Sequence, residues 1–390
     1  MKSFDQGVAE LQKILALGKQ QWFLGAGASV ESGIPLMHPL TSRVESCLTG
    51  DDSNVLKLVM ADLLADAHIE HALSHLGDLM AIAGRSRSAS VRVGDENFGI
   101  DVLESAYRAI VKCIAETIRY GYRPSGSNVE EKIGDPQEPL VDVDLHLDFV
   151  REVFKGRSNL EPRSKIHFVT TNYDTLLEDA LAMEQRVACD GFSGGAIGYW
   201  DGVSIDPTSS FSARTHRVLK LHGSVDWFRD PSLGLLRARY GVRYLSDLAN
   251  ILIYPQATKY LETQKDPFAR IFHCFRRSIQ GPEAQLLAIV GYSFGDDHIN
   301  SEISAALEDP SNKTVVVAFS REVSGGEGSS LPPALARWLN DPVFGSRVYA
   351  ATNTGLYNAS SFVAPRGEEV DLQWWKFTGL TEFLATGEAK

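Results

Sequence analysis

Apolar residues along the chain follow two spacings that alternate over most of its length. Continuous apolar runs, typical of buried strands, stand at residues 21–24, 165–171, 217–224, 286–294 and 313–319. Apolar residues three and four positions apart, which predict amphipathic helices, fill residues 1–19, 172–183, 266–280 and 296–309. Strands that alternate with helices imply parallel pairing through crossover helices. We therefore expect an α/β fold, with a Rossmann-like parallel sheet flanked by helices.

The region between the first two strands carries only helical spacing. Helices are predicted within residues 39–48, 55–82 and 103–120, separated by a polar, glycine-bearing loop at 84–99. Residues 121–139 are dense in Gly, Pro, Ser and charge, which predicts a mobile loop. We interpret residues 45–150 as a mainly helical insert within one domain spanning 1–390.

The segment 331–390 is rich in aromatic residues and is expected to pack on the core of that domain. Its large side chains are Trp338, Trp374, Trp375 and Phe377.

Size and charge narrow the classes of function. A chain of 390 residues can hold one large α/β domain with an insert. The formal net charge of −12 argues against a broad basic surface for nucleic acid. An anionic ligand must then be held by local features, chiefly helix N-termini.

The spacing of the cysteines and the hydropathy of the chain indicate the cellular compartment in which the protein is expected. The four cysteines form no Cys-x-x-Cys pair, which gives no zinc ribbon and suits a reducing cytosol. No stretch approaches the ~20 apolar residues of a membrane span. The amphipathic start lacks the apolar core of a signal peptide, so we expect a cytoplasmic protein.

The first candidate site is the turn Gly25-Ala26-Gly27-Ala28-Ser29, which follows the first strand. Open α/β sheets bind ligands beyond the carboxyl ends of their strands. Two glycines permit a tight turn and a close approach to a pyrophosphate, and the next helix would offer free N–H groups. Val30 stands where a dinucleotide fingerprint has its third glycine, so a ligand-free turn is the alternative.

Two further strands end in polar residues. Asn172 and Asp174 follow the second strand and either point into the crevice or cap the next helix. His222 ends the third strand, where it is either a general base or an ordinary loop histidine.

A glycine and a serine close the fourth strand. Ser293, or backbone amides beside Gly291, would bind a ribose or phosphate, whereas Asp296 would cap the following helix.

Three histidines, His68, His71 and His75, are predicted to share one helix face. A zinc pair is conceivable for this spacing, but no carboxylate completes a metalloenzyme signature. An interface or a solvated face is the alternative.

In this order and spacing, the motifs resemble those of the sirtuin family, which are GAG-x-S, SGIP, Asn-x-Asp, His-Gly and Gly-x-Ser. The chain shows them at 25–29, at Ser32-Gly33-Ile34-Pro35, at 172–174, at His222-Gly223 and at 291–293. The resemblance spans about residues 10–320 without the insert.

Two departures narrow the resemblance. Deacetylating sirtuins continue SGIP with Asp-Phe-Arg, where this chain has Leu36-Met37-His38, and they carry two Cys-x-x-Cys pairs that are absent here. A protein-lysine substrate is therefore not expected. The pattern is similar to that of bacterial sirtuin-like proteins of antiviral defence, closest to the stand-alone subunit that pairs with a HerA-type ATPase.

The resemblance implies an NAD glycohydrolase that depletes NAD, with NAD as substrate and no metal. Asn172 would orient the nicotinamide ribose and a water, and His222 would take a proton from either. The turn at 25–29 would hold the pyrophosphate, and Asp174 would contact the nicotinamide end. Gly291, Ser293 and Ser320 would line the ribose and adenosine side.

Partners follow from the same resemblance. We expect a homo-oligomer with a HerA-type ATPase partner, no membrane contact and no direct contact with nucleic acid. The helical insert and the aromatic tail would be the contact surfaces. The alternatives are a regulatory subunit that binds NAD or ADP-ribose without turnover, and a deacylase or ADP-ribosyltransferase.

Overall fold

A nine-stranded sheet forms the centre of the molecule. The computed structural model describes residues 3–126, 130–155, 165–206, 214–230, 232–239, 250–253, 266–325, 328–359, 361–365 and 371–390. The strands lie in the order β20-β19-β18-β15-β14-β1-β6-β10-β7. Their bounds are β1 Lys19–Leu24, β6 Lys165–Thr170, β7 Val187–Cys189, β10 Thr215–Lys220, β14 Gln285–Val290, β15 Thr314–Phe319, β18 Val348–Ala351, β19 Leu356–Asn358 and β20 Ser361–Val363.

The order of the strands reverses once. All neighbours from β18 to β7 pair in parallel, and the pairs β18–β19 and β19–β20 are antiparallel. From β1 the chain passes through β6 to the edge strand β7 and back to β10, then returns to β14 beside β1 and proceeds the other way through β15 and β18. This is the doubly wound Rossmann order, so the predicted fold class is confirmed. The reversal lies between β1 and β14, where open sheets of this kind form their binding crevice.

Helices cover both faces of the sheet, which explains the continuous apolar runs of its strands. On β1, the Trp22 ring lies 5.1 Å from that of Phe149 on α6, and the Phe23 ring lies 6.1 Å from that of Phe275 on α10, on the other face. One face is covered by α1 (Phe4–Leu15), α6 (Asp144–Phe154), α7 (Leu176–Met183) and α13 (Phe377–Thr386). The other is covered by α10 (Phe268–Ser278), α11 (Asp297–Glu308) and α12 (Pro333–Leu339).

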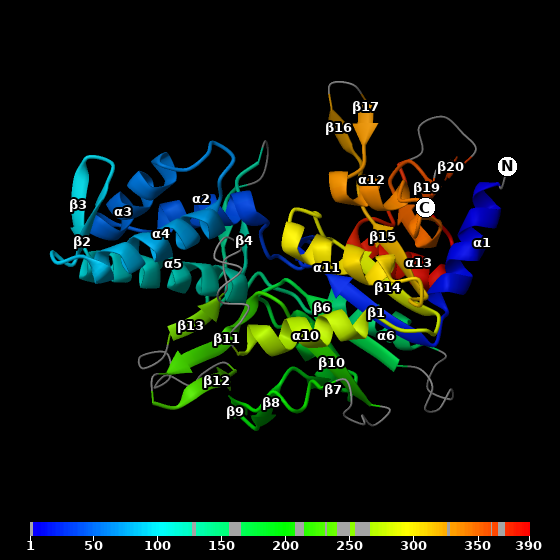
Figure 1. The fold of residues 1–390 in the computed structure, drawn as a ribbon, viewed down its shortest axis with the longest axis horizontal. Coiled ribbons are helices and arrows are strands. Elements are labelled where there is room, and N and C mark those ends of the chain that lie inside the picture. Colours follow the sequence, from blue (N-terminus) through cyan, green and yellow to red (C-terminus); the bar gives the residue numbers. More distant parts are fainter. Residues whose placement is uncertain are drawn as a thin grey trace.

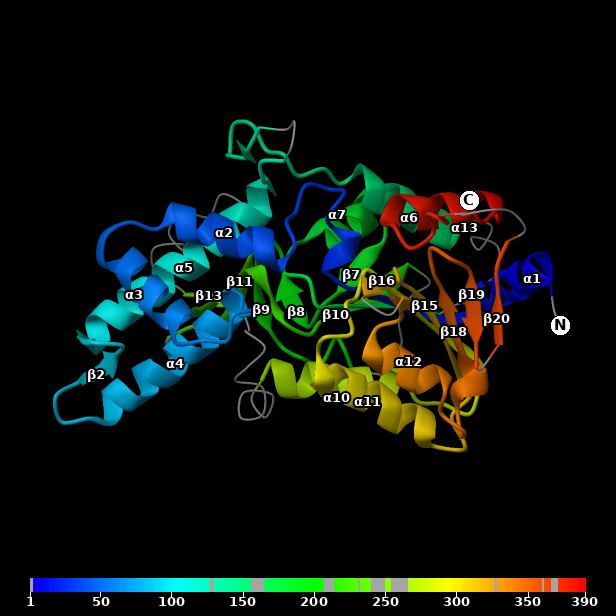
Figure 2. The same ribbon diagram turned by 90° about the horizontal axis from the view of Figure 1, so that it is seen from above.

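Four helices form a separate core at the end of the molecule opposite α1 and α13 (Figures 1 and 2). They are α2 (Met37–Cys47), α3 (Gly50–Ala61), α4 (Ile69–Arg85) and α5 (Ile100–Tyr120). The helical spacing found within 55–82 belongs to two helices, because residues 62–68 separate α3 from α4.

Both loops predicted in this region contain strands. The loop predicted at 84–99 contains a hairpin of β2 (Ser90–Val93) and β3 (Glu96–Gly99). Within 121–139, β4 (Tyr122–Arg123) pairs with β5 (Lys132–Ile133), and residues 127–129 lie outside the described residues. These strands have only two to four residues, too few to distinguish a strand from a polar loop by periodicity.

A second, antiparallel sheet was not predicted. Its strand order is β13-β11-β12-β9-β8, and its strand β11 begins directly after His222. The bounds are β8 Phe192–Gly194, β9 Ile197–Trp200, β11 Gly223–Asp230, β12 Gly234–Ala238 and β13 Asn250–Ile253. In Figure 1, β11 and β13 lie under α5, which contacts both strands. A short further hairpin joins β16 (Val323–Gly325) to β17 (Gly328–Ser330).

The aromatic tail belongs to the core of this chain. Trp338 and Trp374 are 3% and 1% exposed, and Phe377 is 1% exposed. The indole N–H of Trp374 donates to the carbonyl of Thr352 at 2.6 Å. The prediction that the tail offers its tryptophans to a partner is therefore wrong for Trp338 and Trp374. Within the described part of the chain, every helix is too short or too polar to cross a membrane.

Candidate functional site

The turn after β1 packs directly on the turn after β14. The N–H of Gly27 donates to the carbonyl of Gly291 at 2.8 Å. A Cβ on Gly25 would lie 2.6 Å from the oxygen of Gly291, and one on Gly27 would lie 2.8 Å from its Cα. Backbone thus touches backbone at the point where the strand order reverses, which requires glycine at both positions.

The same turn differs from the expectation of free N–H groups at a helix start. Residues 26–28 form one 3-10 turn, and the next α-helix begins at Met37. Four N–H groups of the turn, those of Gly25, Gly27, Ala28 and Ser29, donate to carbonyls of the chain itself. The expected array of free amides is therefore wrong for these four groups.

Asn172 is held from one side only. Its Nδ2 donates to the carbonyl of Gly25 at 3.1 Å and to the hydroxyl of Ser29 at 3.0 Å. The carbonyl fixes the orientation of the amide, because it accepts only from the NH2 end. The Oδ1 is buried and has no hydrogen-bond partner among the described residues. Such an acceptor costs about 1–3 kcal/mol, which a donor from a bound ligand would recover.

Asp174 fixes the serine that Asn172 contacts. Its Oδ2 accepts from the Ser29 hydroxyl at 2.8 Å, and its Oδ1 accepts from the N–H of Leu176 at 3.1 Å. Asp174 thus bonds to the first residue of α7, whose N-cap is Thr175, whereas the side chain of Asn172 faces the β1 turn.

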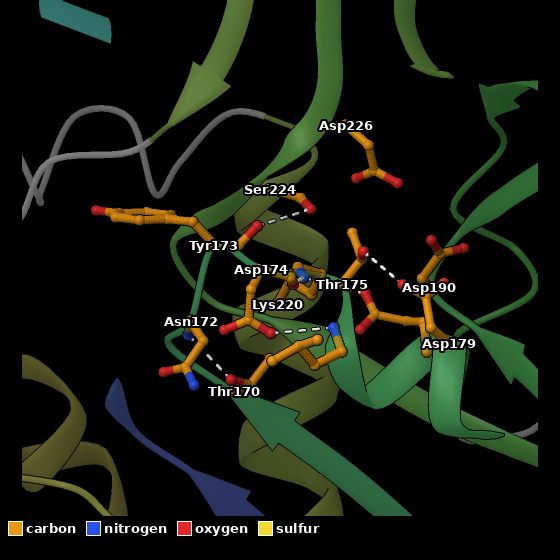
Figure 3. A network of polar contacts seen from close by, with 12 residues as sticks. Thr170, Asn172, Tyr173, Asp174, Thr175, Asp179, Asp190, Lys220, Ser224 and Asp226 are labelled. Atoms are coloured by element: carbon orange, nitrogen blue, oxygen red, sulfur yellow. Dashed lines mark hydrogen bonds and ion pairs between the residues drawn. The ribbon is translucent and has the colours of Figure 1, made fainter. Parts of the chain in front are cut away.

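A buried ionic network around Lys220 contacts the segment 172–174 (Figure 3). The Lys220 ammonium is fully buried, donates to the backbone carbonyl of Asp174 and lies 3.0 Å from Glu178 Oε1. Burial opposes its charge, but the carboxylates of Glu178, Asp174 and Asp226 outweigh that effect and raise the pKa of Lys220. On Glu178, burial is likewise outweighed, and the charges of Lys220 and Arg239 lower its pKa. The charged network therefore persists at neutral pH.

Sequence reasoning missed Lys220, although a signal existed. A lysine inside the apolar run of β10 has to be paired if that strand is central.

Tyr173 connects the segment to the helical region. In Figure 3 its ring extends away from the side that holds Thr175 and Asp179. Its hydroxyl donates to Glu70 Oε1 of α4 at 2.6 Å, and both residues are buried. Burial, together with the charge of Glu70, raises the pKa of Tyr173 well above its ordinary value. Nothing in the helical spacing around Glu70 predicted this contact.

His222 lies between β10 and β11 and is 4% exposed, so it is no ordinary loop histidine. Its Nε2 lies 3.2 Å from Asp296 Oδ2. Asp296 Oδ1 accepts from the N–H groups of His298 and Ile299 at 3.0 and 3.3 Å. The predicted cap of α11 is thus confirmed, and the same carboxylate also reaches His222.

The remaining residues lie at the same edge of the sheet. Gly291 has a φ of +62° beside the β1 turn. Ser293 is exposed, and its hydroxyl accepts from the N–H of Gly295 at 3.3 Å. Ser320 follows β15, and its N–H donates to the carbonyl of Ala351. Hydrogen bonds thus connect Asn172 and Asp174 directly to the turn at 25–29. His222 contacts Asp296, at the end of the turn that follows β14.

The SGIP segment docks onto the start of α6. The Ser32 hydroxyl lies 3.3 Å from His146 Nδ1, and the N–H of Asp142 donates to the carbonyl of Ser32. A Cβ on Gly33 would lie 2.4 Å from the carbonyl oxygen of Leu140. This segment therefore braces the end of the β1 turn.

The three histidines lie at the start of α4, where His71 and His75 are one turn apart and the ring of His68 lies 4.0 Å from that of His71. His68 precedes α4 as its N-cap, and its backbone N–H donates to His71 Nδ1 at 3.2 Å. His75 Nε2 lies 3.1 Å from Asp62. Among the residues that the structure describes, no cluster of three or more His, Cys, Asp or Glu has a geometry for a metal ion.

Fold and site together define a doubly wound α/β protein with a buried polar site where its strand order reverses. Residues 166–341 match the family model of the SIR2-like domain. That segment contains Asn172, Asp174, His222 and Ser293, whereas the turn at 25–29 precedes it.

One solved structure similar to the chain is described as the crystal structure of a Sir2 homolog–NAD complex. It has 11% sequence identity and a TM-score of 0.43, over 96% of this chain and 91% of the other. A comparison with curated protein sequences gave no match.

Proposed function

We propose that the protein is an NAD glycohydrolase, which uses water to cleave NAD into nicotinamide and ADP-ribose. The observation that carries the proposal is the buried Asn172 Oδ1, an acceptor without a partner in the described chain, at the edge of the sheet where the strand order reverses. The match of residues 166–341 to a SIR2-like domain supports NAD-related chemistry at this place.

The residues suit the reaction. Nicotinamide leaves NAD as a neutral molecule from a cationic ring, so the ribose becomes oxocarbenium-like without a strong nucleophile. The protein has to orient the sugar, stabilise the developing positive charge and place a water. Asn172 Oδ1 accepts a hydrogen bond from a ribose hydroxyl or from that water. As the water oxygen bonds to the anomeric carbon, its proton passes to His222.

The other candidate residues would hold the rest of NAD. The turn at 25–29, which includes Ala26, packs on Gly291. Together with Ser293, it would take the pyrophosphate and a ribose. Ser320 would lie on the adenosine side. Asp174 acts at the nicotinamide end through Ser29, whose hydroxyl it accepts. Bond cleavage of this kind needs no metal.

Substitution of the two central residues tests the proposal. Asn172→Ala and His222→Ala should each lower nicotinamide release by on the order of a hundredfold or more. Asn340→Ala and His273→Ala are the matched controls, because both residues are exposed and lie away from the site, His273 on α10 and Asn340 directly after α12. Chromatographic detection of nicotinamide and ADP-ribose measures the rate.

Three results separate the proposal from its alternatives. Near-normal turnover in either site variant contradicts the role given to that residue. Binding of NAD by the unmodified protein without nicotinamide release identifies a regulatory subunit. Transfer of an acetyl group from a peptide identifies a deacylase.

We further propose that the enzyme depletes NAD as an effector of bacterial antiviral defence, in a homo-oligomer that works with a HerA-type ATPase. The resemblance of the motifs supports this role. An enzyme that freely destroyed NAD would exhaust its own cell, so assembly or a partner has to control it.

A further inference from the structure

We propose that Asp296 is a positioning residue for His222: it holds the imidazole proton on Nε2 and thereby makes Nδ1 the atom that accepts a proton. The inference rests on the proposed role of His222. It assigns a second function to a residue whose sequence context indicates only a helix cap.

The contact crosses the carboxyl edge of the sheet. His222 follows β10 and Asp296 follows β14, and β6 and β1 lie between these strands. Neighbouring strands are about 4.8 Å apart, so β10 and β14 are separated by about 14 Å. The two turns nevertheless bring Nε2 and Oδ2 within 3.2 Å of each other. The pair therefore spans the ends of β1 and β6, which carry the turn at 25–29 and Asn172.

The chemistry of the pair fixes the tautomer. A carboxylate at neutral pH only accepts hydrogen bonds, so the ring nitrogen facing it has to carry the proton. In a neutral imidazole the other nitrogen then holds the lone pair. Because Asp296 faces Nε2, the lone pair of His222 lies on Nδ1.

Asp296 is itself rigidly held, as a positioning residue has to be. Its Oδ1 caps α11, and its backbone carbonyl accepts from the N–H of Asn300 at 2.9 Å and from the Tyr292 hydroxyl at 3.2 Å. The side chain is 2% exposed. The two carboxylate oxygens of Asp296 thus have different partners: Oδ1 caps α11, and Oδ2 contacts His222.

Asp296→Asn tests the assignment with almost no change in shape. The amide oxygen can keep the helix cap, and the NH2 group then faces Nε2 and favours the tautomer with the proton on Nδ1. We expect kcat for nicotinamide release to fall by on the order of a hundredfold or more, as a wrong tautomer does in hydrolytic triads. KM should change by less than about threefold, since only the transition state uses the base.

Two companions control for structure. Asp297→Asn removes the same charge from the exposed neighbouring residue and should leave kcat unchanged. Asp296→Ser keeps a good helix cap but is too short to reach His222, and it should show the same loss of kcat. If Asp296→Asn fails to fold, the serine variant supplies the answer.

Nitrogen NMR of labelled histidine in the full-length protein at about pH 8 gives a readout independent of turnover. The His222 signals are assigned by their loss in His222→Ala. We expect a protonated Nε2 in the unmodified protein and a protonated Nδ1 in Asp296→Asn. A protonated Nδ1 in the unmodified protein, or an Asp296→Asn variant with unchanged tautomer and unchanged kcat, overturns the inference. An unmodified protein that shows the predicted tautomer but releases no nicotinamide contradicts the proposed function and leaves the pairing intact.

Discussion

His216 lies on β10 upstream of His222, and both of its ring nitrogens are engaged. Its Nδ1 lies 2.8 Å from the carbonyl of Ile166, and its Nε2 lies 3.2 Å from the Arg186 guanidinium. A carbonyl requires a donor and a guanidinium requires an acceptor, so the neutral ring is the form that fits. Burial, with a smaller contribution from the charge of Arg186, lowers the pKa of His216 to about 4.

A depressed histidine pKa links stability to pH with a definite sign. The unfolded chain binds the proton near pH 6.5, the ordinary value, whereas the folded chain binds it only near pH 4. The contribution of His216 to the free energy of unfolding is therefore complete above pH 6.5 and is lost as the pH falls toward 4. We expect this group to remove up to about 3 kcal/mol of unfolding free energy over that range. Urea denaturation at a series of pH values measures it.

A histidine variant isolates this contribution from other titrating groups. His216→Asn keeps a donor for the Ile166 carbonyl but cannot take up a proton, so its stability should depend less on pH between 6.5 and 4. His273→Asn alters an exposed histidine and should keep the parent dependence. Identical pH profiles for the parent and His216→Asn would disprove the linkage.

The sequence allowed the candidate residues to be named but not their contacts. Asn172, Asp174 and His222 could be found because they end apolar strands, and strand ends of a parallel sheet converge. The pairing of His222 with Asp296 could not be found, because it depends on the path of two turns across two intervening strands. The free N–H groups predicted at the start of the next helix do not lie beside the turn at 25–29, because that helix begins only at Met37 and the turn packs on the β14 turn.

At the scale of elements, α4 begins beside the candidate site, and Glu70 on its first turn accepts from Tyr173. Tyr173→Phe removes that hydrogen bond and leaves a buried carboxylate without it. We expect a loss of unfolding free energy of about 1–3 kcal/mol, because hydrogen bonds to charged groups contribute that much. Hydrogen exchange in the first turn of α4 should become faster.

The matched control for this prediction is Tyr199→Phe, which removes the hydroxyl of a tyrosine that is 59% exposed. Its stability should stay within about 0.5 kcal/mol of the parent. If Tyr173→Phe is as stable as Tyr199→Phe, and exchange in α4 is unaltered, the contact does not connect the helices to the site.

The central sheet and its helices could be predicted from periodicity, because buried parallel strands are long and continuously apolar. The antiparallel sheet could not be predicted in this way. Its strands β8, β9, β12 and β13 have three to five residues, Gly194 of β8 pairs with Gly198 of β9, and the longer β11 begins with the mixed residues of GSVDWFRD. The first four lack the length, and β11 the clean alternation, that distinguishes a strand from a loop.

At the scale of the whole molecule, the described residues form three large core clusters, one on each face of the central sheet and one among α2–α5, and a small fourth cluster in the antiparallel sheet. Tyr173, Leu176 and Val225 belong to the cluster among α2–α5, although they come from the segments around the site. The helical region is therefore continuous with the site through packed side chains and not only through its two chain connections.

We expect light scattering to give a mass of at least two chains and the HerA-type ATPase to co-purify with the protein. Because Trp338 and Trp374 are buried within one chain, dissociation by dilution should hardly shift the tryptophan emission maximum. That leaves α2–α5 as the expected contact surface. A strict monomer that cleaves NAD at full rate without the ATPase would refute the gated assembly.

The reversal of strand order has one more consequence. Asn172 and His222 come from the half of the sheet that β1, β6 and β10 build, whereas Gly291 and Asp296 come from the half that β14, β15 and β18 build. Neither half contains the pair of His222 and Asp296, nor the contact of the β1 turn with Gly291. A chain cut between β13 and α10 would yield two fragments that are each chemically incomplete. The complete site therefore forms only while the two halves of the protein are packed on each other.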